Sequence, residues 1–317
     1  MERPAHHPET PAPRIGVLLV NLGSPDAPEP GAVRRYLREF LSDRRGVEIP
    51  PIIWQVILNL FVLTTRPRKS AHAYQQVWTA EGAPLVAITR RQAEALAARL
   101  GGIVMVDWAM RYGAPSIADR LETLKAAGCE RILIAPLYPQ YSGATTATVM
   151  DAVGRALAAM RWQPAIRTLP PYHDDPLHIN ALAADAKAHL AALDFTPDAL
   201  LASFHSMPER TLSLGDPYHC QCQKTARLLS DALGQPLTIS FQSRLGRAKW
   251  LEPSTEATLA TLAQKGVRKL AVLTPGFSAD NLETLEEIAI RGRETFLEAG
   301  GTYFAALPCL NDGAPGM

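Results

Sequence analysis

Short aliphatic runs alternate along this chain with longer amphipathic stretches. The aliphatic runs are seven to nine residues long and are bounded by glycine, proline or polar residues, which is typical of buried strands. They lie at residues 15–22, 102–110, 131–137, 199–205, 236–243 and 269–275. The stretches between them, such as 90–100 and 117–128, repeat apolar residues with helical spacing. The alternation predicts βαβ units, and therefore parallel sheets flanked by helices.

A weak internal similarity divides the chain into two halves. The strands at 15–22 and 199–205 run into serine- and proline-containing loops, and those at 131–137 and 269–275 run into aromatic loops rich in serine and threonine. Prolines concentrate in RTLPPYHDDP, which indicates a boundary near 165–175. We therefore predict a disordered tail at 1–14 and domains at 15–170 and 171–317. Because ligands bind at the carboxyl ends of parallel strands, we expect a site in a cleft between the domains.

Composition excludes several classes of protein. The 317 residues are 47% hydrophobic and 20% charged, which is typical of a globular enzyme and atypical of a disordered chain. A net charge of +1 gives no global attraction for polyanions, so we expect no nucleic-acid partner. The four cysteines are too few for a disulfide framework, and the first residues contain no apolar signal segment. These features favour a reducing, cytoplasmic location.

The segment IIWQVILNLFVL at 52–63 is apolar but has only 12 residues, whereas a membrane-spanning helix needs about 20. Two interpretations stay open. The segment is either a core-facing helix or an apolar helix at a pocket lip or lipid interface, since Arg66, Arg68 and Lys69 follow it.

Nucleotide-binding and hydrolase signatures are missing from the sequence, which contains no G-x-G-x-x-G after a strand, no Walker A motif and no G-x-S-x-G. His205 closes the apolar run ALLASF, so its imidazole is expected at the carboxyl edge of a sheet, where it can accept a proton or bind a metal ion. A purely structural histidine is the alternative. The motif YHCQC at 218–222 lacks the four ligands of a closed metal site, and we do not assign it one.

Three carboxylates, Asp280, Glu283 and Glu287, have the spacing of one helix face. Like charges on one face repel, so the pattern favours a metal-ion path or a proton relay. The alternative is local, with Asp280 as N-cap and Glu283 as its capping-box partner.

Aromatic and cationic residues follow several of the predicted strands. Trp250 and Phe277 are suited to the faces of a large flat apolar ligand, while Arg66 and Arg111 could meet carboxylates at its edge. Ordinary core packing is the alternative for each aromatic residue taken singly.

Taken together, these segments resemble the ferrochelatases, which insert ferrous iron into a porphyrin at the end of haem synthesis. The resemblance runs from about residue 15 to 310 and rests on seven ordered blocks: VLLVNLGSPDAP, VRRYLREFLSD with EIPP, MRYG, PLYPQYSGATT, SFHSMPER with GDPY, FQSRLGRAKWLEP and PGFSADNLETLEEI.

The resemblance implies two similar Rossmann-like α/β domains, each a four-stranded parallel sheet flanked by helices, with the active cleft between them and no nucleotide. It implies that His205 and Glu283 are the catalytic and metal-binding pair for Fe²⁺, which is a substrate, with Asp280 and Glu287 as an auxiliary acidic path. It also implies that the porphyrin pocket is lined by Arg66, Arg111, Tyr112, Met207, Pro208, Trp250 and Phe277.

Three departures from the family pattern follow from the same comparison. Asn281 stands where some members carry a metal-ligating histidine or cysteine, which places more weight on Glu283. Cys309 stands alone near the C-terminus, so no [2Fe–2S] cluster is expected. By the same resemblance, the family's last helix is expected to be missing after LNDGAPGM.

The resemblance further implies a monomer whose residues 49–69 form a hydrophobic lip in peripheral contact with a membrane. Two alternatives stay open at this point. One is a chelatase for another tetrapyrrole, coproporphyrin or sirohydrochlorin, and the other is a porphyrin-binding protein without turnover.

Overall fold

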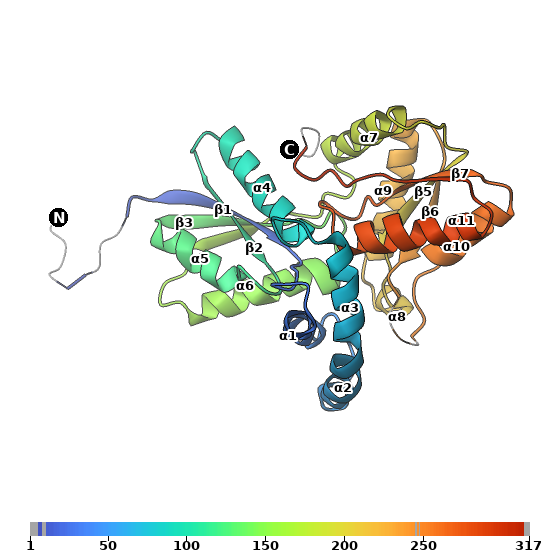
Figure 1. Cartoon of the computed structure of the whole chain (residues 1–317). Helices are drawn as coiled ribbons and strands as arrows, with labels where there is room; N and C mark the ends of the chain where they lie inside the picture. Colours follow the sequence, from blue (N-terminus) through green and yellow to red (C-terminus); the bar gives the residue numbers. More distant parts are fainter. Residues whose placement is uncertain (1–5, 8–10, 245, 247, 314–317) are drawn as a thin grey trace.

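Two parallel β-sheets of four strands each form the centre of the chain, in a computed structural model that describes residues 6–7, 11–244, 246 and 248–313 (Figure 1). The first sheet has the order β2-β1-β3-β4, and its strands are β1 (Arg14–Asn21), β2 (Met105–Met110), β3 (Cys129–Pro136) and β4 (Ala165–Thr168). The second has the order β6-β5-β7-β8, and its strands are β5 (Ala199–His205), β6 (Leu237–Gln242), β7 (Lys269–Leu273) and β8 (Tyr303–Ala306). The predicted fold class is confirmed. Part of the predicted tail, residues 1–5 and 8–10, lies outside the described residues.

The sequence pattern missed β4 and β8, which are the outer strands of the two sheets on the same side of the order. Each has only four residues, and most of them are half-buried or exposed. A short edge strand needs no continuous apolar run, so its sequence carries little strand signal.

Helices connect the strands and cover both faces of each sheet. They are α1 (Pro30–Leu41), α2 (Pro51–Ile57), α3 (Leu63–Val77), α4 (Pro84–Arg99), α5 (Ile117–Ala126), α6 (Thr148–Ala159), α7 (Pro176–Ala191), α8 (Glu209–Ser213), α9 (Tyr218–Leu233), α10 (Thr255–Gln264) and α11 (Arg293–Glu298). Three segments are π-helical: η1 (Leu58–Val62), η2 (Gly143–Ala147) and η3 (Glu283–Gly292).

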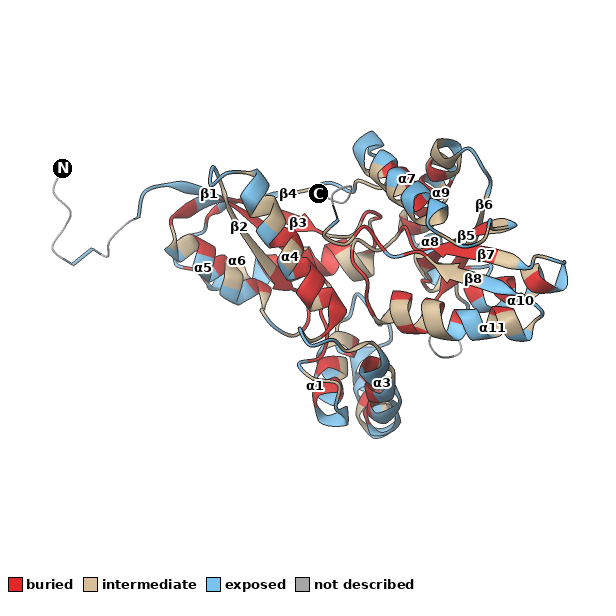
Figure 2. Ribbon diagram, turned by 45° about the horizontal axis from the view of Figure 1, so that its top comes forward, coloured by how far each residue is buried: buried red, intermediate tan, exposed pale blue. Residues whose placement is uncertain are grey.

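Alternating side chains of the central strands build a core on each side of each sheet. In the first domain, Leu18 of β1 packs with α5 and α6, and its neighbour Leu19 packs with α4. In the second, Phe204 of β5 packs with α9, whereas Leu201 packs with α10, η3 and α11. Figure 2 shows this burial running along both sheets. The alternation means that neighbouring residues at the end of a strand point to opposite sides of the sheet.

Helices α1 to α3 extend away from the first sheet (Figure 1). Their inner side is anchored by Trp54 and Leu58, and the Trp54 indole N–H donates to the Leu41 carbonyl at 2.6 Å. The outer side of residues 52–61 is exposed at Ile52, Ile53, Val56, Leu60 and Phe61. The segment is therefore neither wholly core nor wholly surface. Within the described residues, no helix is both long enough and apolar enough to span a membrane.

Hydrogen bonds join the two domains at the loop after β3. The buried Gln140 side chain donates to the Thr225 hydroxyl of α9 at 3.0 Å, and the Gly143 N–H donates to the Asp216 carboxylate at 2.7 Å. Leu22, which follows β1, packs beside Ala279, which follows β7. The carboxyl ends of the two sheets therefore meet.

Gly23, in the loop after β1, is a position where the backbone tolerates no side chain. Its φ is +110°, and a Cβ atom there would lie 1.9 Å from the Tyr112 carbonyl oxygen. We expect Gly23→Ala to lower the free energy of unfolding by about 3 kcal/mol or more, because both strain and a backbone clash result. Urea denaturation measures the change.

Gly31→Ala is the matched control, because a Cβ at that helical position meets no atom within 4 Å. It should leave stability unchanged or raise it by about 0.5–1 kcal/mol. Equal effects of the two substitutions would contradict the assignment of Gly23.

Candidate active site

His205 lies at the carboxyl end of β5 and is half-buried, as the apolar run before it predicts. Its Nδ1 is 2.6 Å from the carbonyl oxygen of Ser206. Because a carbonyl only accepts hydrogen bonds, Nδ1 carries the proton, and in the neutral ring Nε2 keeps its lone pair. The imidazole is thereby oriented with one nitrogen free to take a proton or bind a metal ion.

Glu283 begins the π-helix η3 and is also half-buried. Burial raises the pKa of its carboxyl group above the ordinary value. The charges of Glu287 and Glu286 raise it further, while His205 acts in the opposite direction. A nearby cation would lower the pKa of such a carboxyl group and favour its charged form. A group that exchanges a bound proton for a metal ion needs this property.

The N-cap of this helix is Asn281, not Asp280. The Asn281 side-chain oxygen accepts from the backbone N–H groups of Glu283 at 3.0 Å and Thr284 at 3.1 Å. The Thr284 hydroxyl accepts from the Asn281 N–H in return, at 3.0 Å. The capping interpretation based on Asp280 and Glu283 is therefore wrong, because the reciprocal pair begins one residue later. Asn281, which the sequence did not predict to be a metal ligand, caps the helix.

Asp280 is bonded to the C-terminal segment. Its carboxylate accepts from the Asn311 amide at 2.7 Å, the Thr284 hydroxyl at 2.9 Å and the Cys309 N–H at 3.3 Å. Gln92 of the first domain also donates to the Asn311 carbonyl, at 2.8 Å. Asp280 thus fixes the loop before η3 to a segment shared by both domains.

Glu287 lies one turn beyond Glu283 and is held by a single residue, Ser243, which follows β6 directly. The Ser243 N–H donates to its Oε1 at 2.8 Å, and the Ser243 hydroxyl donates to its Oε2. Glu286 instead pairs with Arg291 at 2.9 Å. Arg291 is five residues farther on, which is the spacing of one π-helical turn, so Glu286 is directed away from Glu287.

Two buried tyrosines of the first domain lie near Glu283. Burial raises the pKa of Tyr36 and of Tyr74, and the negative charge of Glu283 raises both further. The Tyr36 hydroxyl donates to the Gly23 carbonyl at 3.0 Å. Tyr74 of α3 shares an apolar cluster with Leu282, the residue before Glu283. Glu283 therefore lies where the two domains meet.

Arg111 and Tyr112 follow β2 and are tied to Asp43, a residue that the sequence did not single out. Arg111 and the Thr148 hydroxyl both donate to the same Asp43 oxygen, and the Tyr112 hydroxyl reaches it at 3.0 Å. The Arg111 Nε also donates to the Thr148 hydroxyl at 2.7 Å. The cluster joins the end of β2, the start of α6 and the residues after α1. Its only sequence signal was Asp43 within the LSD block.

The other predicted pocket residues fall into two groups. Met207 and Pro208 lie two and three residues after His205, and Pro208 forms a backbone bridge with Trp250. These three residues are therefore brought together near the histidine. Arg66 is exposed on α3 and makes no hydrogen bond or ion pair with any residue that the structure describes.

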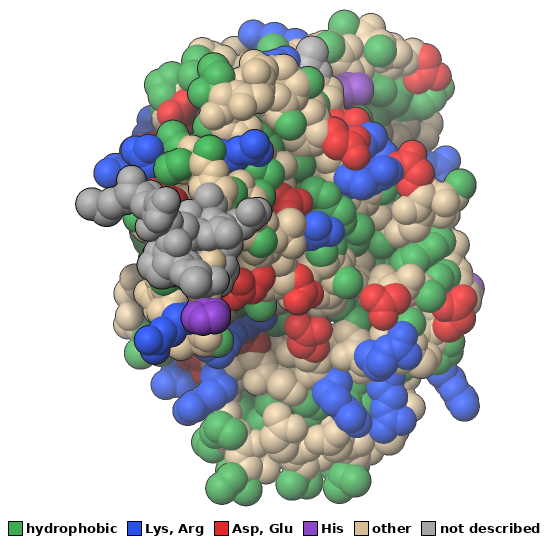
Figure 3. Space-filling view, turned by 90° about the vertical axis from the view of Figure 1, so that its left-hand side faces the viewer, with side chains coloured by type: hydrophobic (Ala, Val, Ile, Leu, Met, Phe, Trp, Pro, Cys, Tyr) green, Lys and Arg blue, Asp and Glu red, His purple; other side chains and the backbone are tan. Residues whose placement is uncertain are grey.

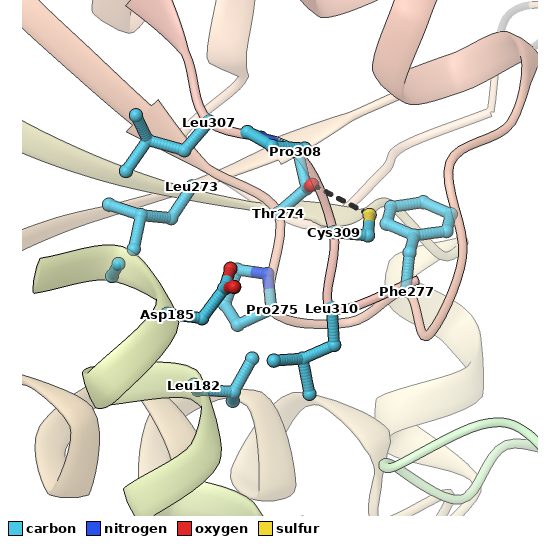
Figure 4. A pocket seen from close by; sticks show the side chains of 11 residues that line it. Leu182, Asp185, Leu273, Thr274, Pro275, Phe277, Leu307, Pro308, Cys309 and Leu310 are labelled. Carbon is cyan, nitrogen blue, oxygen red and sulfur yellow. Dashed lines mark hydrogen bonds between the residues drawn. The ribbon is translucent and has the colours of Figure 1, made fainter. Parts of the chain in front are cut away.

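Phe277 follows β7 and lies beside the C-terminal segment. It lines a cavity of about 20 Å³, with room for about one water molecule, together with Asp185 and Leu310 (Figure 4). The Thr274 hydroxyl and the Cys309 sulfur are 3.4 Å apart in the same wall. Phe277 thus contacts the C-terminal segment, and His205 and Glu283 are not among the residues that line this cavity.

We expect Asp43→Asn to lower the free energy of unfolding by about 3 kcal/mol near pH 7. The reason is that Arg111, with a side chain only 9% exposed, would lose its charged partner. Asp151→Asn is the matched control. Its ion pair with Arg45 is exposed, so the loss should stay below about 1 kcal/mol.

The advantage conferred by Asp43 should depend on pH. Burial by itself would raise the pKa of Asp43, but the bonds from Thr148 and Arg45 and the charge of Arg111 hold it below the ordinary 3.8. The stabilisation is therefore present above pH 3.8 and is lost as the pH falls through the lowered value. Denaturation of both proteins across this range measures it, and a pH-independent difference would contradict the assignment.

Comparison with known proteins shows the family of this chain. The family model described as Ferrochelatase matches residues 14–315. The ferrochelatase of Rhizobium meliloti (strain 1021) is 54% identical over 324 residues, which cover 100% of this chain and 96% of that protein. The ferrochelatase of Azoarcus sp. (strain BH72) is 54% identical over 316 residues, which cover 98% and 86%.

Comparison with solved structures supports the fold but not the function, because the sequence identities are low. SirB from Bacillus subtilis with Fe³⁺ has a TM-score of 0.57 at 12% identity, with coverage of 96% of this chain and 91% of that one. The identity of the family rests on the sequence relatives and on the model match over nearly the whole chain. This chain belongs to the ferrochelatase family.

Proposed function

We propose that this chain inserts Fe²⁺ into protoporphyrin IX to give protohaem, with His205 and Glu283 as the reacting pair. Family membership makes it a metal chelatase of the lyase class with Fe²⁺ as substrate. The residue assignment is supported by Glu283, whose carboxyl group is half-buried with a pKa raised by burial, and by His205, whose ring is oriented through Nδ1 so that Nε2 keeps its lone pair.

The chemistry needs two protons to leave the pyrrole N–H groups as four nitrogens bind the iron. The free Nε2 of His205 is suited to accept a proton or to hold the metal ion. Glu283 is suited to the complementary task, because its carboxyl group can bind either a proton or a cation. The Glu287 carboxylate, held in place by hydrogen bonds from Ser243, lies one turn farther along the helix.

For the macrocycle, we propose a pocket wall formed by Met207, Pro208 and Trp250 beside His205. These apolar and aromatic side chains suit the face of a porphyrin. Arg66 is suited to a propionate, since it has no partner among the described residues. Arg111 and Tyr112 act differently in this proposal. Because both are hydrogen-bonded to Asp43, they would form a rigid part of the pocket wall and would not bind a propionate.

Two alternatives have less support. The solved SirB structure shares the fold, but at 12% sequence identity this similarity gives no information about the substrate of this chain. A porphyrin-binding protein without turnover would not require the His205 and Glu283 pair. The expectations of a monomer, a cytoplasmic location and no iron–sulfur cluster stay predictions.

We further propose that the exposed face of residues 52–61 touches a membrane surface. Figure 3 shows hydrophobic side chains at the lower end of the molecule, with Lys and Arg side chains above them. The exposed cations Arg66, Arg68 and Lys69 follow the apolar residues, and Arg34, Arg35 and Arg38 line a hollow on the adjacent α1. Apolar side chains flanked by cations suit an interface with anionic lipids.

Anaerobic insertion of Fe²⁺ into protoporphyrin IX, with Zn²⁺ as a check, tests the activity through loss of free-base fluorescence. We expect His205→Ala and Glu283→Gln each to lower kcat by about 100-fold or more while porphyrin still binds. Glu294→Gln is the control, because Glu294 is an exposed residue of α11, on the next helical segment. Binding of porphyrin by the unaltered protein without metal insertion would identify a non-catalytic binder. Faster turnover of coproporphyrin than of protoporphyrin IX would show that coproporphyrin is the preferred substrate.

Sedimentation with vesicles of phosphatidylcholine, with and without phosphatidylglycerol, tests the membrane contact. We expect binding to the anionic vesicles that weakens with salt, and Ile52→Ser with Phe61→Ser should weaken it about tenfold or more. Ile103→Ser is the control, since Ile103 is 83% exposed elsewhere. No preference for anionic vesicles over buffer would refute the contact.

A further inference from the structure

Two neighbouring strands of the second sheet, β5 and β6, end in the same pattern. β5 ends in Ser203-Phe204-His205, and β6 ends in Ser-Phe-Gln at 240–242. The parallel register pairs serine with serine, phenylalanine with phenylalanine, and His205 with Gln242. The phenylalanines lie in the cluster against α9, so the serines, His205 and Gln242 point to the opposite face of the sheet.

This opposite face holds a buried polar network. The Ser203 hydroxyl donates to the Gln242 side-chain oxygen at 2.6 Å and lies 2.7 Å from the Thr255 hydroxyl of α10. Thr255 is also 2.8 Å from the Ser240 hydroxyl. All four residues are at most 3% exposed. Burying four polar side chains costs stability unless each is bonded, and an apolar core would need no such arrangement.

Gln242 connects this network to both proposed catalytic residues. Its side-chain N–H donates to the Glu283 carbonyl at 3.2 Å. Its own carbonyl accepts from the Ser206 N–H at 2.7 Å, and the Ser206 carbonyl in turn accepts from the His205 ring. One residue therefore contacts the turn that orients the imidazole and the helix that carries the carboxylate.

Ser243 extends the connection to Glu287. It is a non-glycine residue with a φ of +67°, a conformation that costs free energy for any L-residue with a side chain. In this conformation its N–H and its hydroxyl both donate to the two oxygens of the Glu287 carboxylate. The two charge-assisted hydrogen bonds offset the conformational free energy that the positive φ costs.

We propose that Gln242 and Ser243, at the end of β6, are positioning residues that fix the Glu283 and Glu287 face of η3 relative to His205. The inference rests on the proposed function. In it, Gln242 sets the first turn of the helix and Ser243 sets the second. Neither residue needs to touch the porphyrin, the iron or the protons in transfer.

A double-mutant cycle with Glu283 tests the role of Gln242. Gln242→Met keeps the length of the side chain and removes both amide bonds. We expect kcat for Zn²⁺ insertion to fall by about 10-fold or more with KM for protoporphyrin unchanged, because only the alignment of the reacting groups is lost. In the Glu283→Gln background the same change should cause no further fall, since the carboxylate that it aligns is gone.

Equal falls in both backgrounds, or a rise in KM alone, would overturn the proposal for Gln242. Full activity of Glu283→Gln by itself would instead refute the proposed function, so the two failures are distinguishable. Thr258→Val is the control for disturbing α10, because Thr258 bonds only within its helix, to the Ser254 carbonyl. It should leave kcat unchanged.

Ser243→Gly gives a second test that does not depend on Gln242. Glycine accepts the positive φ without strain, so the relief of strain should offset the loss of the hydroxyl bond, and the thermal midpoint should change little. We nevertheless expect kcat to fall several-fold, because the hydroxyl bond to Glu287 is lost. Unchanged kcat in a protein of unchanged stability would overturn the role of Ser243.

Discussion

The parallel pairing of β5 with β6 is the interaction on which the proposed site depends. It sets His205 beside Gln242 and directs both to the face of the sheet that η3 covers. A slip of β6 by one residue against β5 would turn Gln242 toward α9 and place Phe241 on the face that holds His205. Phe204 and Phe241 are completely buried against α9, and the apolar surface that they bury stabilises the observed register. The hydrophobic core on one side of the sheet therefore determines the position of the chemistry on the other.

The first domain contributes to the same site mainly by enclosing it. Its helices bring Tyr36 and Tyr74 near Glu283, and both phenols stay protonated because burial raises their pKa. The orientation of these helices depends in turn on Asp43, whose carboxylate accepts donors from the end of β2 and the start of α6. An ion pair of this kind adds little stability compared with an apolar core, but it fixes one arrangement of its partners. Arg111 is held by that arrangement.

Much of the fold could be predicted from the sequence, because six strands carry continuous apolar runs and the connecting helices carry a clear period. The position of His205 followed from the same rule, since it ends such a run. The Asn281 cap could not be chosen over Asp280 from spacing alone, because both residue types cap helices and they are adjacent. Gln242 and Asp43 were missed for a related reason. Their importance lies in contacts with residues 41 and 105 positions away, which no local pattern encodes.

The surroundings of Glu283 combine two opposing influences. It lies in the first turn of a helix, where the unpaired N–H groups favour a negative charge. Burial and the charges of Glu286 and Glu287 act against that charge, and together they raise its pKa. Glu287 meanwhile has two donors of its own and needs no further cation. In the proposed reaction a metal ion must be held and then released to four pyrrole nitrogens. A carboxylate with an incompletely compensated charge meets both needs, because it gains from an arriving cation and binds a proton more readily than an ordinary glutamate when the cation leaves.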